Sequence, residues 1–310
     1  MMIKILRNLS VVALIIVAAA CSRAESEPDR AVYEAEIMDW RAGRLERLLA
    51  PNGFLTQIGL YWLEQGTYTI GSAPGNDIVV PDTAAASIGE FQVGPDGVRL
   101  VVSEDVEVLL DGEAVSDVFM GADTSANPVT VEHRSLAWSV IERAGKLAVR
   151  IRDYGHPFVD TFGPIPYYDI DPDLRVTARL ELYAEPRKVA VDTVIEGFQQ
   201  FPVAPGVAHF EIGGKQYQLE PTLSGDSLFF VFGDETNRGE TYGAGRFVYS
   251  DLPDENGELI LDFNKSYSPP CAFNDFSTCP VASPRNRLPI RIEAGEKFET
   301  YLHYSGAAAH

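Results

Sequence analysis

The spacing of apolar residues changes near residue 54, and this change predicts the fold class. Before it, apolar side chains recur every three or four residues, so residues 31–50 are predicted to form an amphipathic helix that Pro51-Asn-Gly ends. After it the period is two, and turn pairs such as Asp111-Gly112 separate short runs of Val, Ile and Leu. The pattern predicts an all-β, mainly antiparallel fold with one amino-terminal helix.

A Pro-rich passage divides this β pattern into two sandwich-like or barrel-like halves. Residues 152–173 contain Gly163-Pro-Ile-Pro and Asp171-Pro-Asp, which are turn signals, and we interpret the passage as a packed junction. The division predicts a β-sandwich over residues 51–151 and a carboxy-terminal β domain over residues 174–305. Residues 287–292 and 298–303 are predicted to be its last strands.

The first twenty residues have the pattern of a targeting segment. Lys4 and Arg7 precede an apolar run that ends in Ala18-Ala-Ala before Cys21, which predicts a secretory signal peptide over residues 1–20. The run resembles a bacterial lipobox, and the resemblance implies that Cys21 is lipid-modified and that residues 21–30 form a tether. Ser22 after the cysteine implies sorting to the inner leaflet of the outer membrane, facing the periplasm. The alternative is an uncleaved anchor helix, for which the run falls short of the ~20 residues that span a bilayer.

Charge and cysteine content narrow the partners and the compartment. The formal net charge of −20 repels phosphate backbones, so nucleic acid is not expected as a partner. With Cys21 carrying lipid, Cys271 and Cys279 remain as an isolated pair, and in an oxidising periplasm a disulfide is the first interpretation. Free thiols and a metal site remain as alternatives, although two thiols fall short of the four ligands of a structural zinc site.

A stretch of the amino-terminal half resembles the opening of a forkhead-associated domain, a β-sandwich that reads phosphothreonine. The stretch is Tyr68-Thr-Ile-Gly-Ser-Ala-Pro-Gly-Asn-Asp-Ile. The phosphate-binding arginine of that family falls at Ser72, and its Ser-Arg-x-x-His pattern becomes Ala86-Ser-Ile-Gly-Glu. The resemblance therefore implies the fold but not phosphopeptide binding, because no guanidinium is present to form a bidentate pair with phosphate.

Several longer motifs resemble a bacterial and archaeal family that is catalogued as a domain of unknown function, number 1684. They are Thr241-Tyr-Gly-Ala-Gly-Arg-Phe, Leu261-Asp-Phe-Asn-Lys-Ser-Tyr, Cys279-Pro, Asn286-Arg-Leu-Pro and Ala294-Gly-Glu. The resemblance runs from about Trp40 to Lys297, with Ser266 and Ser268 where the family typically has Ala and Asn. That family implies no established activity, so the chemistry has to come from the residues.

The motif residues support two interpretations, a ligand cleft and a buried polar network. Arg246 offers a planar fork of donors for a carboxylate or phosphate, and Asp262 and Asn264, two apart on a predicted strand, share a face. The candidate ligand-binding residues are Tyr242, Arg246, Asn264, Tyr267, Asn286 and Arg287. The candidate catalytic residues are Asp234, Glu240 and Asp262.

Three functions remain open for these residues. The first is binding of a small polar or anionic ligand in a cleft of the carboxy-terminal half. The second is carboxylate-based hydrolysis of envelope glycan or peptide by acid–base chemistry, and the third is a scaffold without catalysis. The sequence lacks G-x-S-x-G, H-E-x-x-H and P-loop motifs, and its histidines are scattered, so neither a cofactor nor a metal site is predicted.

Overall fold

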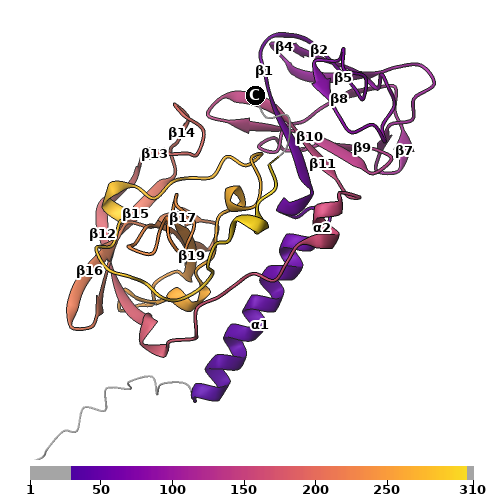
Figure 1. The fold of residues 1–310 in the computed structure, drawn as a ribbon. Coiled ribbons are helices and arrows are strands. Elements are labelled where there is room, and N and C mark those ends of the chain that lie inside the picture. The colour runs from indigo at the N-terminus through magenta and orange to yellow at the C-terminus, as the bar shows by residue number, and fades with distance from the viewer. Residues whose placement is uncertain (1–28, 306–310) are drawn as a thin grey trace, which may run out of the picture.

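The structure is a computed structural model that describes residues 29–305 (Figure 1). The signal peptide predicted over residues 1–20, the lipid-modified Cys21 and nearly all of the tether lie outside the described residues. Within residues 29–305, no helix is both long enough and apolar enough to cross a membrane. The predicted fold class is confirmed, since most elements are antiparallel strands that follow one amino-terminal helix.

The helix α1 spans Arg30–Leu49, and its sequence accounts for both its start and its buried face. The Asp29 side chain caps the first turn by accepting a hydrogen bond from the Ala31 amide at 3.1 Å. Tyr33, Ile37, Arg44 and Leu48 form the buried face at helical spacing. A short 3₁₀ turn, η1 (Phe54–Thr56), leads from the helix into the first strand.

The amino-terminal half is a sandwich of two sheets around one core. The sheet orders are β1-β11-β10-β9-β6-β7 and β3-β2-β4-β5-β8. Ile70 and Phe91 of one sheet and Trp138 and Val149 of the other belong to the same buried cluster. The strands are β1 (Gln57–Leu63), β2 (Gly66–Gly71), β3 (Ile78–Val79), β4 (Gly89–Gly94), β5 (Gly97–Val102), β6 (Leu109–Leu110), β7 (Glu113–Ala114), β8 (Asp117–Phe119), β9 (Thr130–His133), β10 (Leu136–Arg143) and β11 (Lys146–Asp153).

The predicted junction carries two short helical elements and leads into a second lobe with its own core. The helix α2 spans Pro157–Thr161, and the 3₁₀ turn η2 spans Pro172–Leu174. The sheets of the second lobe have the orders β16-β15-β12-β20, β17-β18-β19 and β13-β14. The strands are β12 (Arg175–Lys188), β13 (Val191–Asp192), β14 (Gln199–Gln200), β15 (Val203–Ile212), β16 (Lys215–Leu219), β17 (Thr222–Ser224), β18 (Ser227–Phe232), β19 (Arg246–Asp251) and β20 (Glu258–Asp262).

Residues 287–292 and 298–303, which were expected to be strands, are not strands in the structure. The chain after β20 instead carries the 3₁₀ turns η3 (Phe263–Lys265), η4 (Pro270–Ala272), η5 (Pro284–Asn286) and η6 (Thr300–Leu302). The physical reason is visible at Ile292, whose amide donates to the Asp234 carboxylate at 2.7 Å and whose carbonyl accepts from Arg246 at 2.8 Å. Side chains satisfy backbone groups that a strand ladder would otherwise pair.

The two lobes lie on either side of a shared apolar contact, and α1 runs beside them in Figure 1. Leu60, Ile141 and Ala148 of the amino-terminal sheet pack against Phe276 of the second lobe. Trp62 and Phe198 also meet across the junction, with ring centroids 5.2 Å apart. The two lobes are therefore packed against each other through apolar and aromatic side chains.

Candidate functional site

Arg246 and Asp234 form a fully buried ion pair in the second lobe. The Arg246 guanidinium lies 2.9 Å from the Asp234 carboxylate, and both side chains are shielded completely from solvent. Arg246 also donates to the carbonyls of Ile292 and Ala294, and Asp234 accepts from the Thr236 hydroxyl at 2.6 Å. These bonds tie the unpaired segment after η5 to the sheet, so this pair belongs to the polar network rather than to a cleft.

Asp262 and Asn264 belong to a second network, which fastens α1 to the lobe. The Tyr33 hydroxyl donates to Asp262 at 2.8 Å and accepts from the Asn264 amide at 2.9 Å. Asn264 also exchanges two hydrogen bonds with the backbone of Asp171. Burial raises the pKa of the Asp262 carboxyl above its ordinary value, and one of its oxygens is buried without a hydrogen-bond partner.

Three further candidate residues, Glu240, Tyr242 and Tyr267, lie apart from these two networks. Glu240 accepts from Arg291 and, at 2.8 Å, from the Tyr168 hydroxyl, and these bonds hold the pKa of Glu240 below its ordinary value. Tyr242 and Tyr267 pack around Cys271 and Cys279. The structure therefore does not bring the candidate site residues together in one cleft.

The two cysteines are buried free thiols in the structure. The Cys271 amide donates to the Cys279 sulfur at 3.1 Å, and burial raises the pKa of the Cys271 thiol. The two cysteines and Phe247 form a buried cluster, and Phe229 and Val231 pack against it. The disulfide stays a prediction, which the adjacency of the two cysteines supports.

A buried ion pair between Arg44 of α1 and Glu296 was missed from the sequence. The two groups lie 2.9 Å apart, and Glu296 also accepts from the Ser268 amide at 2.7 Å. The Arg44 guanidinium stacks 4.5 Å from the centre of the Tyr267 ring. The signal that could have revealed it was Arg44 itself, a charged residue four positions before Leu48 on the apolar face of the helix.

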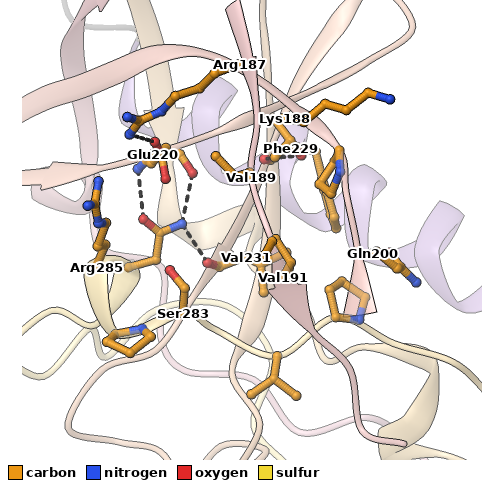
Figure 2. Close-up of a pocket in the computed structure, with 17 residues that line it drawn as sticks. Arg187, Lys188, Val189, Val191, Gln200, Glu220, Phe229, Val231, Ser283 and Arg285 are labelled. Carbon is orange, nitrogen blue, oxygen red and sulfur yellow. Dashed lines mark hydrogen bonds and ion pairs between the residues drawn. The ribbon is translucent and has the colours of Figure 1, made fainter. Parts of the chain in front are cut away.

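The same lobe contains a pocket of about 480 Å³ (Figure 2). Its floor is one face of β18, from which Phe229 and Val231 project, and its walls come from the end of β12, from β13 and β14 and from residues 280–286. The apolar lining residues are Val189, Ala190, Val191, Pro202, Phe229, Val231, Pro280, Val281 and Pro284. A volume of this size suits a small organic ligand.

The polar side of the pocket is built by an ion pair and an amide. Arg187 lies 2.7 Å from Glu220, and Asn286 exchanges hydrogen bonds with the Glu220 backbone at 2.8 and 2.9 Å. Desolvation raises the pKa of Glu220, but hydrogen bonds from Arg187 and Tyr183 outweigh it, and the net pKa is lowered. Lys188 and Arg285 add two further cations to the lining.

Of the candidate ligand-binding and catalytic residues, all of which lie within residues 29–305, Asn286 alone lines this pocket. Arg287 is its exposed neighbour along the chain. Sequence reasoning missed the cations Arg187, Lys188 and Arg285 and the acid Glu220. The dipeptide Arg187-Lys188 at the end of a strand and Arg285 beside Asn286 were the signals available, and both look like ordinary surface charges in a sequence.

The residues that line the pocket do not provide the paired carboxylates of an acid–base hydrolase. Among the described residues that line it, Glu220 is the single carboxylate, and Arg187 neutralises it. A hydrolase that works through paired carboxylates needs a second one within ~5–10 Å. Within residues 29–305, no group of three or more His, Cys, Asp or Glu side chains is placed to hold a metal ion.

The comparisons with known proteins identify similar structures but assign no activity to this chain. No curated protein matches the chain. The solution structure of an uncharacterized protein from Haloarcula marismortui is 28% identical over 44% of this chain and 78% of its own, with a TM-score of 0.38. The cytoplasmic domain of the T3SS sorting platform protein PscD from P. aeruginosa is 21% identical over 31% of this chain and 80% of its own, with a TM-score of 0.20.

The family comparison covers the part of the chain that holds the pocket. All residues that line the pocket fall between positions 187 and 286. Residues 160–297 match the model of the family described as "Protein of unknown function (DUF1684)".

Proposed function

We propose that this chain is a lipid-anchored envelope protein that binds a small organic anion in the pocket of its carboxy-terminal half. The observation that carries the proposal is the charge of the lining. In a chain of formal net charge −20, three cations and one carboxylate meet in this pocket. Lys188 and Arg285 form no ion pair with any described residue, and Arg285 adds to the positive charges that lower the pKa of Glu220.

The apolar floor defines the other end of the ligand. Phe229, Val231 and the proline-rich wall offer surface that a purely polar ion would leave unused. A ligand with a carboxylate or phosphate head and a short apolar body would satisfy both sides. The Gln200 amide, which uses one of its two N–H groups on the Thr278 carbonyl, would give the head a hydrogen bond. We therefore place the binding site for the polar or anionic ligand, which the sequence suggested near Arg246, in this pocket instead.

A thermal-shift screen tests the binding proposal. Hexanoate and hexyl phosphate are expected to raise Tm in a concentration-dependent way, since a ligand that binds the folded state stabilises it. Hexylammonium, with the same apolar body and the opposite charge, is expected to have no such effect. The proposal fails if neither anion raises Tm or if hexylammonium raises it equally.

The anchoring part of the proposal is motivated by the apolar run that ends at Cys21. Labelled palmitate is expected to enter the wild-type protein in bacteria and not the Cys21→Ser variant. Several acyl chains give stable attachment without a spanning helix. If the wild-type protein takes up no label, the lipid anchor is refuted, but the proposal that the pocket binds an anion is not affected.

A further inference from the structure

We propose a second anion-binding site at the junction of the two lobes, centred on Arg150 of β11. This proposal is independent of the pocket, since Arg150 does not line it. The Nε atom of Arg150 is buried and has no hydrogen-bond partner, and the guanidinium forms no ion pair with any residue between 29 and 305. The ligand class is a small oxyanion, either a phosphate or a carboxylate.

The register of the sheet shows which way Arg150 faces. Arg150 pairs with Leu60 of β1 and with Ser139 of β10, and Leu60 lies in the cluster that packs against Phe276 of the other lobe. Paired residues of neighbouring strands project to the same face of a sheet. The Arg150 side chain therefore lies on the face of the sheet that packs against the second lobe.

Two more arginines flank this guanidinium. Burial, together with the positive charges of Arg143 and Arg152, lowers the pKa of Arg150 to about 10, so it remains charged at neutral pH. Arg143 is already paired with Asp123 at 2.7 Å. Arg152 donates to the Gly53 carbonyl and the Thr56 hydroxyl, which are uncharged acceptors. Three cations thus share one carboxylate.

Such an arrangement is unfavourable unless an anion completes it. Arg150 is half-buried, so water only partly solvates its charge. The planar fork of an arginine binds oxyanions through two parallel hydrogen bonds. An oxyanion at Arg150 would relieve the repulsion among the arginines and would join the two lobes at their contact.

Thermal unfolding of the full chain in detergent tests this site with inorganic phosphate as the probe. Sodium chloride holds the ionic strength constant, and acetate in place of phosphate distinguishes a carboxylate from a phosphate preference. Phosphate or acetate is expected to raise the Tm of the wild type by about 2–4 °C at saturation. Arg150→Met is expected to abolish that rise and to melt no lower than the wild type without added anion, because it removes an unpaired charge.

Two control variants keep the test specific. Arg99→Gln, at an exposed ion pair with Asp117, is expected to keep the full response to the anion. Lys188→Gln/Arg285→Gln, which alters the pocket, is also expected to keep it. A wild type whose Tm responds to neither anion would overturn the proposal, as would an Arg150→Met variant that responds like the wild type. If Arg150→Met does not fold, loss of the response in Arg150→Lys or Arg150→Gln supports the site, and an unchanged response there overturns it.

Discussion

Among single residues, Arg246 shows how a donor group suited to a ligand can serve the fold instead. Its fork meets the Asp234 carboxylate and two backbone carbonyls, all without access to solvent. A buried charge is tolerated when it is paired and hydrogen-bonded. The residue before Arg246 has to be a glycine. Gly245 has a φ of +117°, and a Cβ there would lie 2.6 Å from the Phe232 carbonyl oxygen.

Removing one partner of this pair is expected to destabilise the protein strongly. Arg246→Gln leaves Asp234 as an unpaired buried charge, which costs about 3–5 kcal/mol of unfolding free energy. Urea denaturation measures the loss. The matched control is Arg291→Gln, whose half-exposed pairs with Glu240 and Glu293 are expected to contribute little to stability. Equal losses in the two variants would contradict the structural role of Arg246.

Asp262 is expected to make stability depend on pH. Burial raises its pKa in the folded state, so the stability that its protonated form contributes is present below the unfolded value of about 4 and is lost as pH rises through the folded value. Asp262→Asn does not titrate. Its unfolding free energy, relative to the wild type, is expected to increase between about pH 4 and pH 7. If the difference in unfolding free energy between Asp262→Asn and the wild type stays constant over this pH range, the raised pKa of Asp262 is contradicted.

Among the elements, the sequence predicted best where the hydrophobic period alone decides. The helix predicted over residues 31–50 is α1 within one residue at each end, because its buried face repeats at helical spacing. The predicted strand at residues 287–292 failed because Asp234 and Arg246, far away in the sequence, bind its backbone groups. Local patterns carry no information about such long-range partners.

The ion pair between Arg44 and Glu296 is expected to contribute strongly to the attachment of α1 to the second lobe. Glu296→Gln leaves the Arg44 guanidinium buried without its counter-charge, and about 3–5 kcal/mol of unfolding free energy should be lost. Limited proteolysis should then cut at or near α1 sooner than in the wild type. Glu34→Gln is the control, because its i,i+4 pair with Arg30 is exposed. Proteolysis of Glu296→Gln at the wild-type rate would contradict this role.

The segment that holds Cys271 and Cys279 supports the pocket wall, since Pro280 and Val281 follow directly. Protein secreted into the periplasm and analysed without reductant should contain a peptide pair joined by a disulfide between the two cysteines. On the chain-entropy model, closing so short a loop stabilises the fold by roughly 2–3 kcal/mol. Complete alkylation of both thiols before any reduction would refute the bond.

On the scale of the whole molecule, the pocket depends on features that no single stretch of sequence displays. Its lining comes from β12, β13, β14, β17, β18 and η5, which the fold brings together across about a hundred residues. Asn286 was predicted because its motif stood out. Arg187, Lys188 and Arg285 were not, because a cation becomes part of a site only through its neighbours in space.

The measurement that tests the pocket most directly is calorimetric titration of hexyl phosphate into the full chain and two variants. The wild type should bind hexyl phosphate in the pocket, and Lys188→Gln/Arg285→Gln should bind it there at least about tenfold more weakly, since a hydrogen bond to a charged group contributes about 1.5–3 kcal/mol. Lys215→Gln, at an exposed position outside the pocket lining, should bind like the wild type. Equal affinities of the double variant and the wild type, or no binding to the wild type, would contradict the anion pocket.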